Sequence, residues 1–203
     1  MFVGKSITSY VSGHDITDYI SLNEAKYQNN IETSNTAYDV ELTTALKAAF
    51  TMVEAWVGYS IRKANVKYAY SGLLSNGEIR VYSKVHSVTS VKYLDENEDE
   101  QDIEAKYQLW DSLGLTIYVT GSAATLSKSE TNYVVNFVEG YDISKGVGNT
   151  ESQVFPVALK QAILMLTSLY FTNRQPVAFG GNPQEIPLTY QALISPYQIT
   201  KFT

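Results

Sequence analysis

Residues 155–176 read "FPVALKQAILMLTSLYFTNRQP", and this stretch decides the fold because it predicts a long helix. Pro156 stands at a position that is favoured in the first turn of a helix. Apolar residues at spacings of three and four form one stripe, which consists of Leu159, Ala162, Ile163, Leu166, Leu169 and Tyr170. Four further apolar residues fall outside the stripe, namely Val157, Leu164, Met165 and Phe171. A helix that is apolar over most of its circumference needs partners on two sides.

A second helix, expected within residues 36–57, can supply one of these partners. Its apolar residues recur at spacings of four and three and share one face, which consists of Leu42, Leu46, Ala49, Val53 and Trp56. Gly58 follows at a position that is typical of a helix end. Ser21 and Glu24 have the spacing of a capping box, so a short helix is predicted to begin there.

Between the two long helices lie six short segments that are rich in Val, Ile, Tyr and Thr and have a period of two. They are "NVKYAY" (65–70), "GEIRVYS" (77–83), "SVTSVKYL" (87–94), "AKYQLW" (105–110), "GLTIYVT" (114–120) and "NYVVNFVEGY" (132–141). Successive strands with no helix between them predict an antiparallel sheet or a small barrel.

The two ends of the chain are less regular. Residues 1–20 predict an extended arm or a short early strand, and the Pro- and Gly-rich residues after Arg174 predict an extended strap with one short turn of helix. The predicted fold class is therefore α+β, a small helical bundle with an inserted antiparallel β-domain and an extended C-terminal arm. Its expected parts are an N-terminal arm (1–19), a helical part (20–64), the β-domain (65–141), a loop with the long helix (142–180) and the strap (181–203).

The composition restricts the functions that the chain can have. Its formal net charge of −6 argues against a protein that binds nucleic acid by neutralising phosphates, although an acidic surface is compatible with DNA that slides past it. There is no Cys, which excludes disulfides and thiolate metal sites. The uncharged residues 161–173 are fewer than the roughly 20 that a membrane-spanning helix needs, so we expect no membrane partner.

No motif for catalysis stands out in the sequence. His14 and His86 are the only two histidines, and they lie in different parts of the chain. His86 is interpreted as a structural histidine because it belongs to a strand-like run. There is no nucleophile elbow, phosphate-binding loop or dinucleotide fingerprint. We therefore expect no catalytic residue, no metal site and no cofactor, and we expect that the chain is not an enzyme.

Two charged clusters have a simple interpretation and a functional one. The run "DENEDEQDIE" (95–104) holds seven of the 21 acids, and clustered carboxylates can bind Ca²⁺ or Mg²⁺. Its spacing does not match an EF-hand loop, so a solvated hairpin tip that discourages edge-to-edge pairing is favoured. Arg62, Lys63 and Lys67 are likewise interpreted as a solvated corner rather than as a phosphate site.

The C-terminal part of the chain is almost uncharged. Residues 156–203 contain one acid, Glu185, and three bases, Lys160, Arg174 and Lys201. A near-neutral segment beside an over-apolar helix is typical of a chain that packs on another chain. It is equally typical of a strap that lies over its own core, and the composition leaves both alternatives open.

The order of these parts resembles one known family. The first long helix ends in "VEAWVG" (53–58), and a strand with a repeated Ser-Val phrase, "SVTSV" (87–91), leads to the hairpin tip at Tyr93 and Asp95. A later strand ends in Gly140 and Tyr141, the late helix opens at Pro156, and the chain closes with "LISPY" (193–197). Over roughly residues 20–200, this order and spacing resemble the head–tail connector (head-completion adaptor) family of tailed bacteriophages.

The resemblance implies a structural virion protein at the neck of the capsid vertex, present in the host cytoplasm during assembly. Such a protein forms a ring of about twelve copies under the portal protein, and a closed ring follows from one contact repeated by rotation. A tail or stopper protein binds beneath the ring, and DNA passes through its centre without sequence-specific binding. A channel that is rich in carboxylates repels the phosphate backbone and lets the duplex slide.

Two sets of residues are expected to serve this role. The expected subunit or portal interface consists of Leu164, Met165, Phe171, Arg174, Ile194, Pro196, Tyr197 and Phe202. The expected channel or tip acids are Asp95, Glu96, Glu98, Asp99 and Glu100. The alternatives are a monomeric decoration or metal-dependent binding domain and, more weakly, a hydrolase with carboxylates far apart in sequence.

Overall fold

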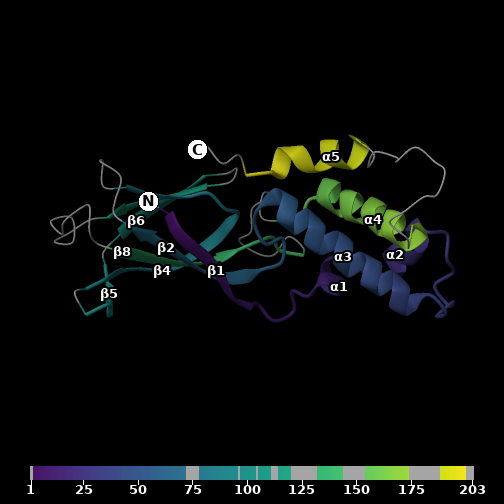
Figure 1. Cartoon of the computed structure of the whole chain (residues 1–203), viewed down its shortest axis with the longest axis horizontal. Helices are drawn as coiled ribbons and strands as arrows, with labels where there is room; N and C mark the ends of the chain where they lie inside the picture. Colours follow the sequence, from purple (N-terminus) through teal and green to yellow (C-terminus); the bar gives the residue numbers. More distant parts are fainter. Residues whose placement is uncertain are drawn as a thin grey trace.

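The computed structural model describes residues 2–71, 78–95, 97–103, 105–110, 114–119, 132–143, 154–173 and 188–199. The helices gather at one end of the long axis and the strands at the other, so the molecule has a helical part and a β part (Figure 1). This arrangement confirms the α+β class.

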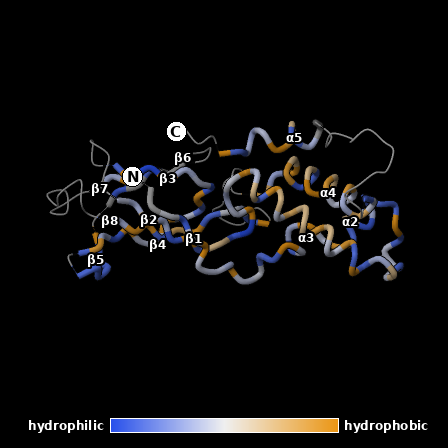
Figure 2. Tube along the Cα trace, in the orientation of Figure 1, coloured by the Kyte–Doolittle hydropathy of each residue, from blue (hydrophilic) through white to orange (hydrophobic). Residues whose placement is uncertain are grey.

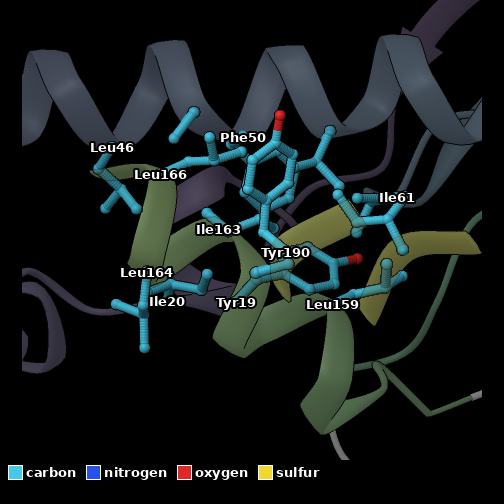
Figure 3. Close-up of a cluster of buried hydrophobic side chains, with 14 of the residues drawn as sticks. Tyr19, Ile20, Leu46, Phe50, Ile61, Leu159, Ile163, Leu164, Leu166 and Tyr190 are labelled. Carbon is cyan, nitrogen blue, oxygen red and sulfur yellow. The ribbon is translucent and has the colours of Figure 1, made fainter. Parts of the chain in front are cut away.

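The helical part is built around two long helices that lie against each other. Its elements are α1 (Ile16–Tyr19), α2 (Leu22–Gln28), α3 (Asp39–Val57), α4 (Val157–Thr172) and α5 (Leu188–Ile194), followed by a 3-10 turn (Ser195–Tyr197). Hydrophobic residues run along α3 and α4 (Figure 2). In the core between them, buried side chains from α1, α3, α4 and α5 meet (Figure 3).

The predicted helix boundaries are largely confirmed. Ser21 caps α2 and forms a capping box with Glu24, since each side chain bonds to the other residue's backbone N–H. Gly58 ends α3 in the left-handed region, with φ 84°, which is unfavourable for residues that have a Cβ. Pro156 is the N-cap of α4 and not a residue of its first turn, so it lies one step earlier than predicted.

The β part consists of two antiparallel sheets that share one core. Its strands are β1 (Phe2–Tyr10), β2 (Ala64–Ser71), β3 (Glu78–Val81), β4 (Val85–Leu94), β5 (Glu100–Asp102), β6 (Ala105–Trp110), β7 (Gly114–Val119) and β8 (Asn132–Glu139). The five-stranded sheet has the order β1-β2-β8-β4-β5, and the three-stranded sheet has the order β3-β7-β6. Val66, Phe137 and Ile117, drawn from both sheets, are among the side chains that fill the core between them.

All six segments that were predicted as strands are strands. The structure adds two more, β1, which was one of two alternatives for its segment, and β5, which lies in the acidic run. Residues 2–10 form β1, an edge strand that pairs with β2 from Phe2↔Tyr70 to Tyr10↔Ala64. The early-strand alternative for this end of the chain is therefore the one that the structure adopts. The acidic run was expected to join two strands of one hairpin, but the chain forms β5 first and then crosses to the other sheet at β6.

The C-terminal strap was predicted to be extended with one short turn of helix, but most of residues 188–199 is helical. This segment forms α5 and a 3-10 turn, and it buries Tyr190 and Ile194 to 2% and 1% exposure. The remaining strap residues, 181–187 and 200–203, lie outside the described residues. In the described ranges, we find no helix with the length and apolar character needed to cross a membrane.

Candidate assembly surfaces

The joint between the helical part and the β part is held by a dense group of hydrogen bonds and ion pairs. Glu54 lies near the end of α3, and its Oε1 accepts the backbone N–H groups of Ile61 at 2.9 Å and Arg62 at 3.3 Å. The same oxygen accepts the hydroxyl of Ser60 at 3.1 Å. One carboxylate therefore holds the whole turn that leads from α3 into β2.

A second carboxylate, Glu139, also binds this turn. It ends β8 and is fully buried. Its Oε1 accepts the backbone N–H of Ser60 at 3.0 Å, and its Oε2 lies 2.7 Å from the Lys5 ammonium of β1. Ser83, from the turn between β3 and β4, donates its hydroxyl to the same carboxylate. A buried charge requires such partners, so this cluster fixes three chain segments at once.

Gly140 and Tyr141 bring the backbone of β8 against the same turn. Gly140 has φ 108°, and a Cβ at this position would lie 2.5 Å from the carbonyl oxygen of Arg62, so only glycine fits. Tyr141 donates its backbone N–H to Ile61 at 3.0 Å, and its carbonyl accepts the hydroxyl of Tyr19 at 2.7 Å. Burial raises the pKa of the Tyr141 phenol to about 12, so this hydroxyl remains protonated at neutral pH.

His86 and the basic group of Arg62, Lys63 and Lys67 all form ion pairs with carboxylates. His86 Nε2 lies 2.8 Å from Asp142, which also binds Lys63, so the structural interpretation of His86 is confirmed. Burial alone would raise the pKa of Asp142, but the hydrogen bonds from Lys63 and His86 outweigh it and hold the pKa below its usual value. Arg62 lies 3.6 Å from Glu54, and Lys67 lies 2.7 Å from Glu100. The basic corner was expected to be solvated, but Arg62 and Lys63 are mostly buried and already paired with carboxylates.

The expected interface residues divide into three groups in the structure. Leu164 is only 8% exposed and Ile194 only 1%, because both pack into the protein's own helical core. Their side chains are therefore covered by this chain itself, and a contact of these two residues with another chain stays a prediction. Their partners come from within the chain, since α5 covers one side of α4 and the helix α2 also contacts it.

The other expected interface residues remain a prediction. Met165, Phe171 and Tyr197 are half-buried, and Pro196 is exposed. Met165 lines a groove of about 280 Å³ between α4 and α5, together with Tyr190. Arg174 and Phe202 lie outside the described residues.

The acidic tip lies at the end of the β part that is far from the helices (Figure 1). Glu98, Asp99 and Glu100 are exposed and Asp95 is partly exposed, whereas Glu96 lies outside the described residues. Asp95 organises the turn, because its Oδ1 accepts the backbone N–H groups of Asn97 at 2.9 Å and Asp99 at 3.0 Å. The hydrogen bond from the side chain of Gln101, together with these two backbone bonds, holds the pKa of Asp95 below its usual value. Within the part of the chain that the structure describes, no group of three or more His, Asp or Glu side chains is arranged to hold a metal ion.

Several exposed apolar side chains were not singled out from the sequence as surface contacts. Val157 and Val40 are 80% and 79% exposed, and Tyr27 is 70% exposed. Val40 lines a groove of about 360 Å³ between α3 and α4, with Phe171 on its other wall. On the β part, Ile7 of β1 is 43% exposed. The position of Val157 outside the apolar stripe of its helix was the one sequence signal for such a surface.

Comparisons with known proteins assign a fold but no sequence family. No protein-family model matches the chain, and no curated protein matches its sequence. A chain of a solved structure described as "Virion of native gene transfer agent (GTA) particle" superposes with a TM-score of 0.71 at 18% identity, covering 99% of this chain and 98% of that one.

Two further structures agree over the same length. Chains described as "Neck of empty GTA particle computed with C6 symmetry" and "Neck of native GTA particle computed with C12 symmetry" match with TM-scores of 0.69 and 0.66, each at 17% identity and the same coverage. The chain therefore has, along almost its whole length, the fold of proteins found in gene transfer agent particles and their necks.

Proposed function

We propose that this chain is a non-enzymatic structural protein of the neck of a phage-like particle. In this role it acts as a connector, or adaptor, between the portal and the tail, and copies of it form a ring through which DNA passes. The observation that carries the proposal is the shared fold, which extends over 99% of the chain and includes a neck structure computed with C12 symmetry. By analogy with that symmetry, we propose twelve copies in the ring.

The positions that carry the family resemblance give independent support, because they have demanding structural roles. Glu54 and Gly58 of "VEAWVG" organise and end α3, and Gly140 allows a backbone approach that any Cβ would block. These residues join the two parts of the molecule. They explain why a connector of this architecture needs these residue types at this spacing.

The charge of the chain fits a channel through which DNA slides. The net charge is −6, and Glu98 and Asp99 of the tip are exposed and form no ion pair within the described residues, whereas Glu100 is bound by Lys67 and Lys92. Carboxylates that face a duplex repel its phosphates and prevent tight binding. We propose the tip acids as the channel-facing group.

Native mass spectrometry over a range of concentrations tests the proposed function, first on the protein alone and then with the portal ring of its particle. The expected result is a closed oligomer, or a monomer that the portal recruits in a fixed number of copies. A compact monomer that ignores the portal at every concentration would overturn the connector role.

The decoration or metal-dependent alternative has less support. Its site would be the acidic tip, but Asp95 already accepts hydrogen bonds on both carboxylate oxygens, from Asn97, Asp99 and the side chain of Gln101. Glu100 is bound by Lys67 and Lys92. Thermal unfolding with millimolar Ca²⁺ would separate the two functions, since the connector role predicts no shift of the melting temperature.

A further inference from the structure

The five-stranded sheet has two outer edges that carry no neighbouring strand in the described ranges. β1 forms one edge and pairs only with β2, on its inner side. At the other edge, β5 covers only the end of β4, from Lys92 to Leu94, and leaves the stretch Ser87–Ser90 without an outer strand. Backbone N–H and C=O groups on an open edge are a template for another strand.

Neither open edge has the charged residues or prolines that usually prevent strand pairing. β1 reads "FVGKSITSY", and its one charged residue, Lys5, is directed to the buried Glu139. The stretch Ser87–Ser90 reads "SVTS" and contains no charge. Ile7 of β1 is also 43% exposed, although it is a strongly apolar residue of an edge strand. These are features of an edge that is available for pairing.

The bulges in both edge strands limit how far such pairing extends. Register shifts in β1 lie between Phe2 and Gly4 and between Ile7 and Ser9, so the regular stretch is Gly4–Ile7. In β4, shifts lie between Val85 and Ser87 and between Val88 and Ser90. The second shift in β4 interrupts the open stretch Ser87–Ser90 itself, so the contact has fewer than four regular pairs and is weak by itself, which fits a protein that assembles only where many such contacts close together.

The two edges are complementary in direction. β1 pairs with β2, β2 with β8 and β8 with β4, and all three pairings are antiparallel, so β1 and β4 run in opposite directions. If a second copy has the same orientation, its β1 is therefore antiparallel to the β4 of the first copy. The occupant that fits each edge is thus the opposite edge of a second copy.

We propose that β1 of one copy pairs with the Ser87–Ser90 edge of β4 in the next copy, so that the five-stranded sheets form a continuous belt around the ring. This inference rests on the proposed ring function and specifies the contact that builds the ring. The contact joins two different surfaces of the same chain, and such a head-to-tail contact closes into a ring when its rotation angle fits.

Disulfide cross-linking tests the belt directly, because the chain contains no Cys and introduced cysteines are its only thiols. Two double variants are used, Ser6→Cys with Ser87→Cys and Ser6→Cys with Thr89→Cys, and all three positions are exposed. Within one copy, β2 and β8 separate the two edges by three strand spacings of roughly 4.8 Å each, which exceeds the reach of a disulfide. After oxidation of the assembled rings, non-reducing denaturing electrophoresis should show a ladder of covalent multimers. The three single-cysteine variants are the controls and should give no species beyond a dimer.

A charge variant provides a second readout that does not depend on cysteine geometry. Ile7→Lys places a charge on the open edge and should reduce the ring population at least tenfold in native mass spectrometry, with an unchanged circular dichroism spectrum. Tyr27→Lys, at a 70% exposed position on α2, is the matched control and should assemble normally. Rings that form without a ladder and tolerate Ile7→Lys would overturn the belt and leave the ring function intact. Absence of any ring, with or without portal, would overturn both.

Discussion

The indole ring of Trp56 stacks on the phenol ring of Tyr190, with their centroids 5.1 Å apart and their planes at 15°. Trp56 belongs to α3 and Tyr190 to α5, so the C-terminal segment covers one side of the long helix pair. The helix α5 also contacts α4, and this packing explains why α4 is apolar around most of its circumference. One side packs on α3 and another on α5 of the same chain.

Tyr190→Ala is expected to detach α5 from the helical core. The change removes a side chain that is 2% exposed and leaves a cavity, which costs about 3–5 kcal/mol for a large aromatic residue. Urea denaturation should measure this loss, and hydrogen exchange should show reduced protection of residues 190–199. Tyr190→Phe is the matched control and should be close to neutral, because the buried hydroxyl has no hydrogen-bond partner among the described residues. Equal protection in the Ala variant and the wild type would contradict the role of this stack.

Lys5→Met is expected to destabilise the joint through Glu139. Lys5 is the cation bound to this fully buried carboxylate, and removal of one partner from a buried ion pair typically costs about 3–5 kcal/mol. The free energy of unfolding from urea titration measures the effect. Lys47→Met, at an exposed position on α3, should change that free energy by less than about 0.5 kcal/mol. Similar values for both variants would show that Glu139 does not depend on Lys5.

Gly140→Ala is expected to be among the most damaging single-methyl changes in the protein. The new Cβ would lie 2.5 Å from the Arg62 carbonyl oxygen, and φ 108° disfavours any residue with a side chain, so we expect a loss of about 3 kcal/mol or more. Gly4→Ala is the matched control, because no atom lies within 4 Å of the Cβ position there. A soluble Gly140→Ala variant with wild-type stability would mean that the turn at Arg62 adopts another conformation.

Asp142 is expected to contribute stability that disappears in acid. Its pKa in the folded protein is lower than the ordinary value of 3.8, so its contribution is fully present above about pH 5 and is lost as the pH falls through the folded-state pKa. Asp142→Asn should therefore lower the melting temperature at pH 6. The difference from the wild type should shrink steadily below pH 4. A difference that stays constant down to pH 2 would exclude Asp142 as the titrating group.

The sequence was sufficient for the elements that have strong local signals. The capping box at Ser21, the helix stop at Gly58 and the six period-two strands all depend on residues close together in the chain, and the structure confirms them. The structural role of His86 was also predicted correctly, although its partner Asp142, 56 residues away, was not.

The errors concern features that depend on tertiary packing. The burial of Leu164 and Ile194 inside the chain's own core was not predicted, because a helix wheel shows that a second side is apolar but not what covers it. The segment after residue 187 was expected to be extended, since a seven-residue helix has little intrinsic signal and is stabilised mainly by burying Tyr190 and Ile194. β1 was uncertain because its pairing with β2 joins residues about 60 positions apart.

The turn at residues 60–62 has a mechanical consequence. Glu54 and Glu139 both accept hydrogen bonds from it, and the backbone of Gly140 lies directly against it. Bending the molecule at this point would break several hydrogen bonds and expose a buried charge in the same step, so the turn cannot serve as a soft hinge. We therefore expect the connection between the two parts to be rigid, so that a force applied to the helices moves the strands together with them.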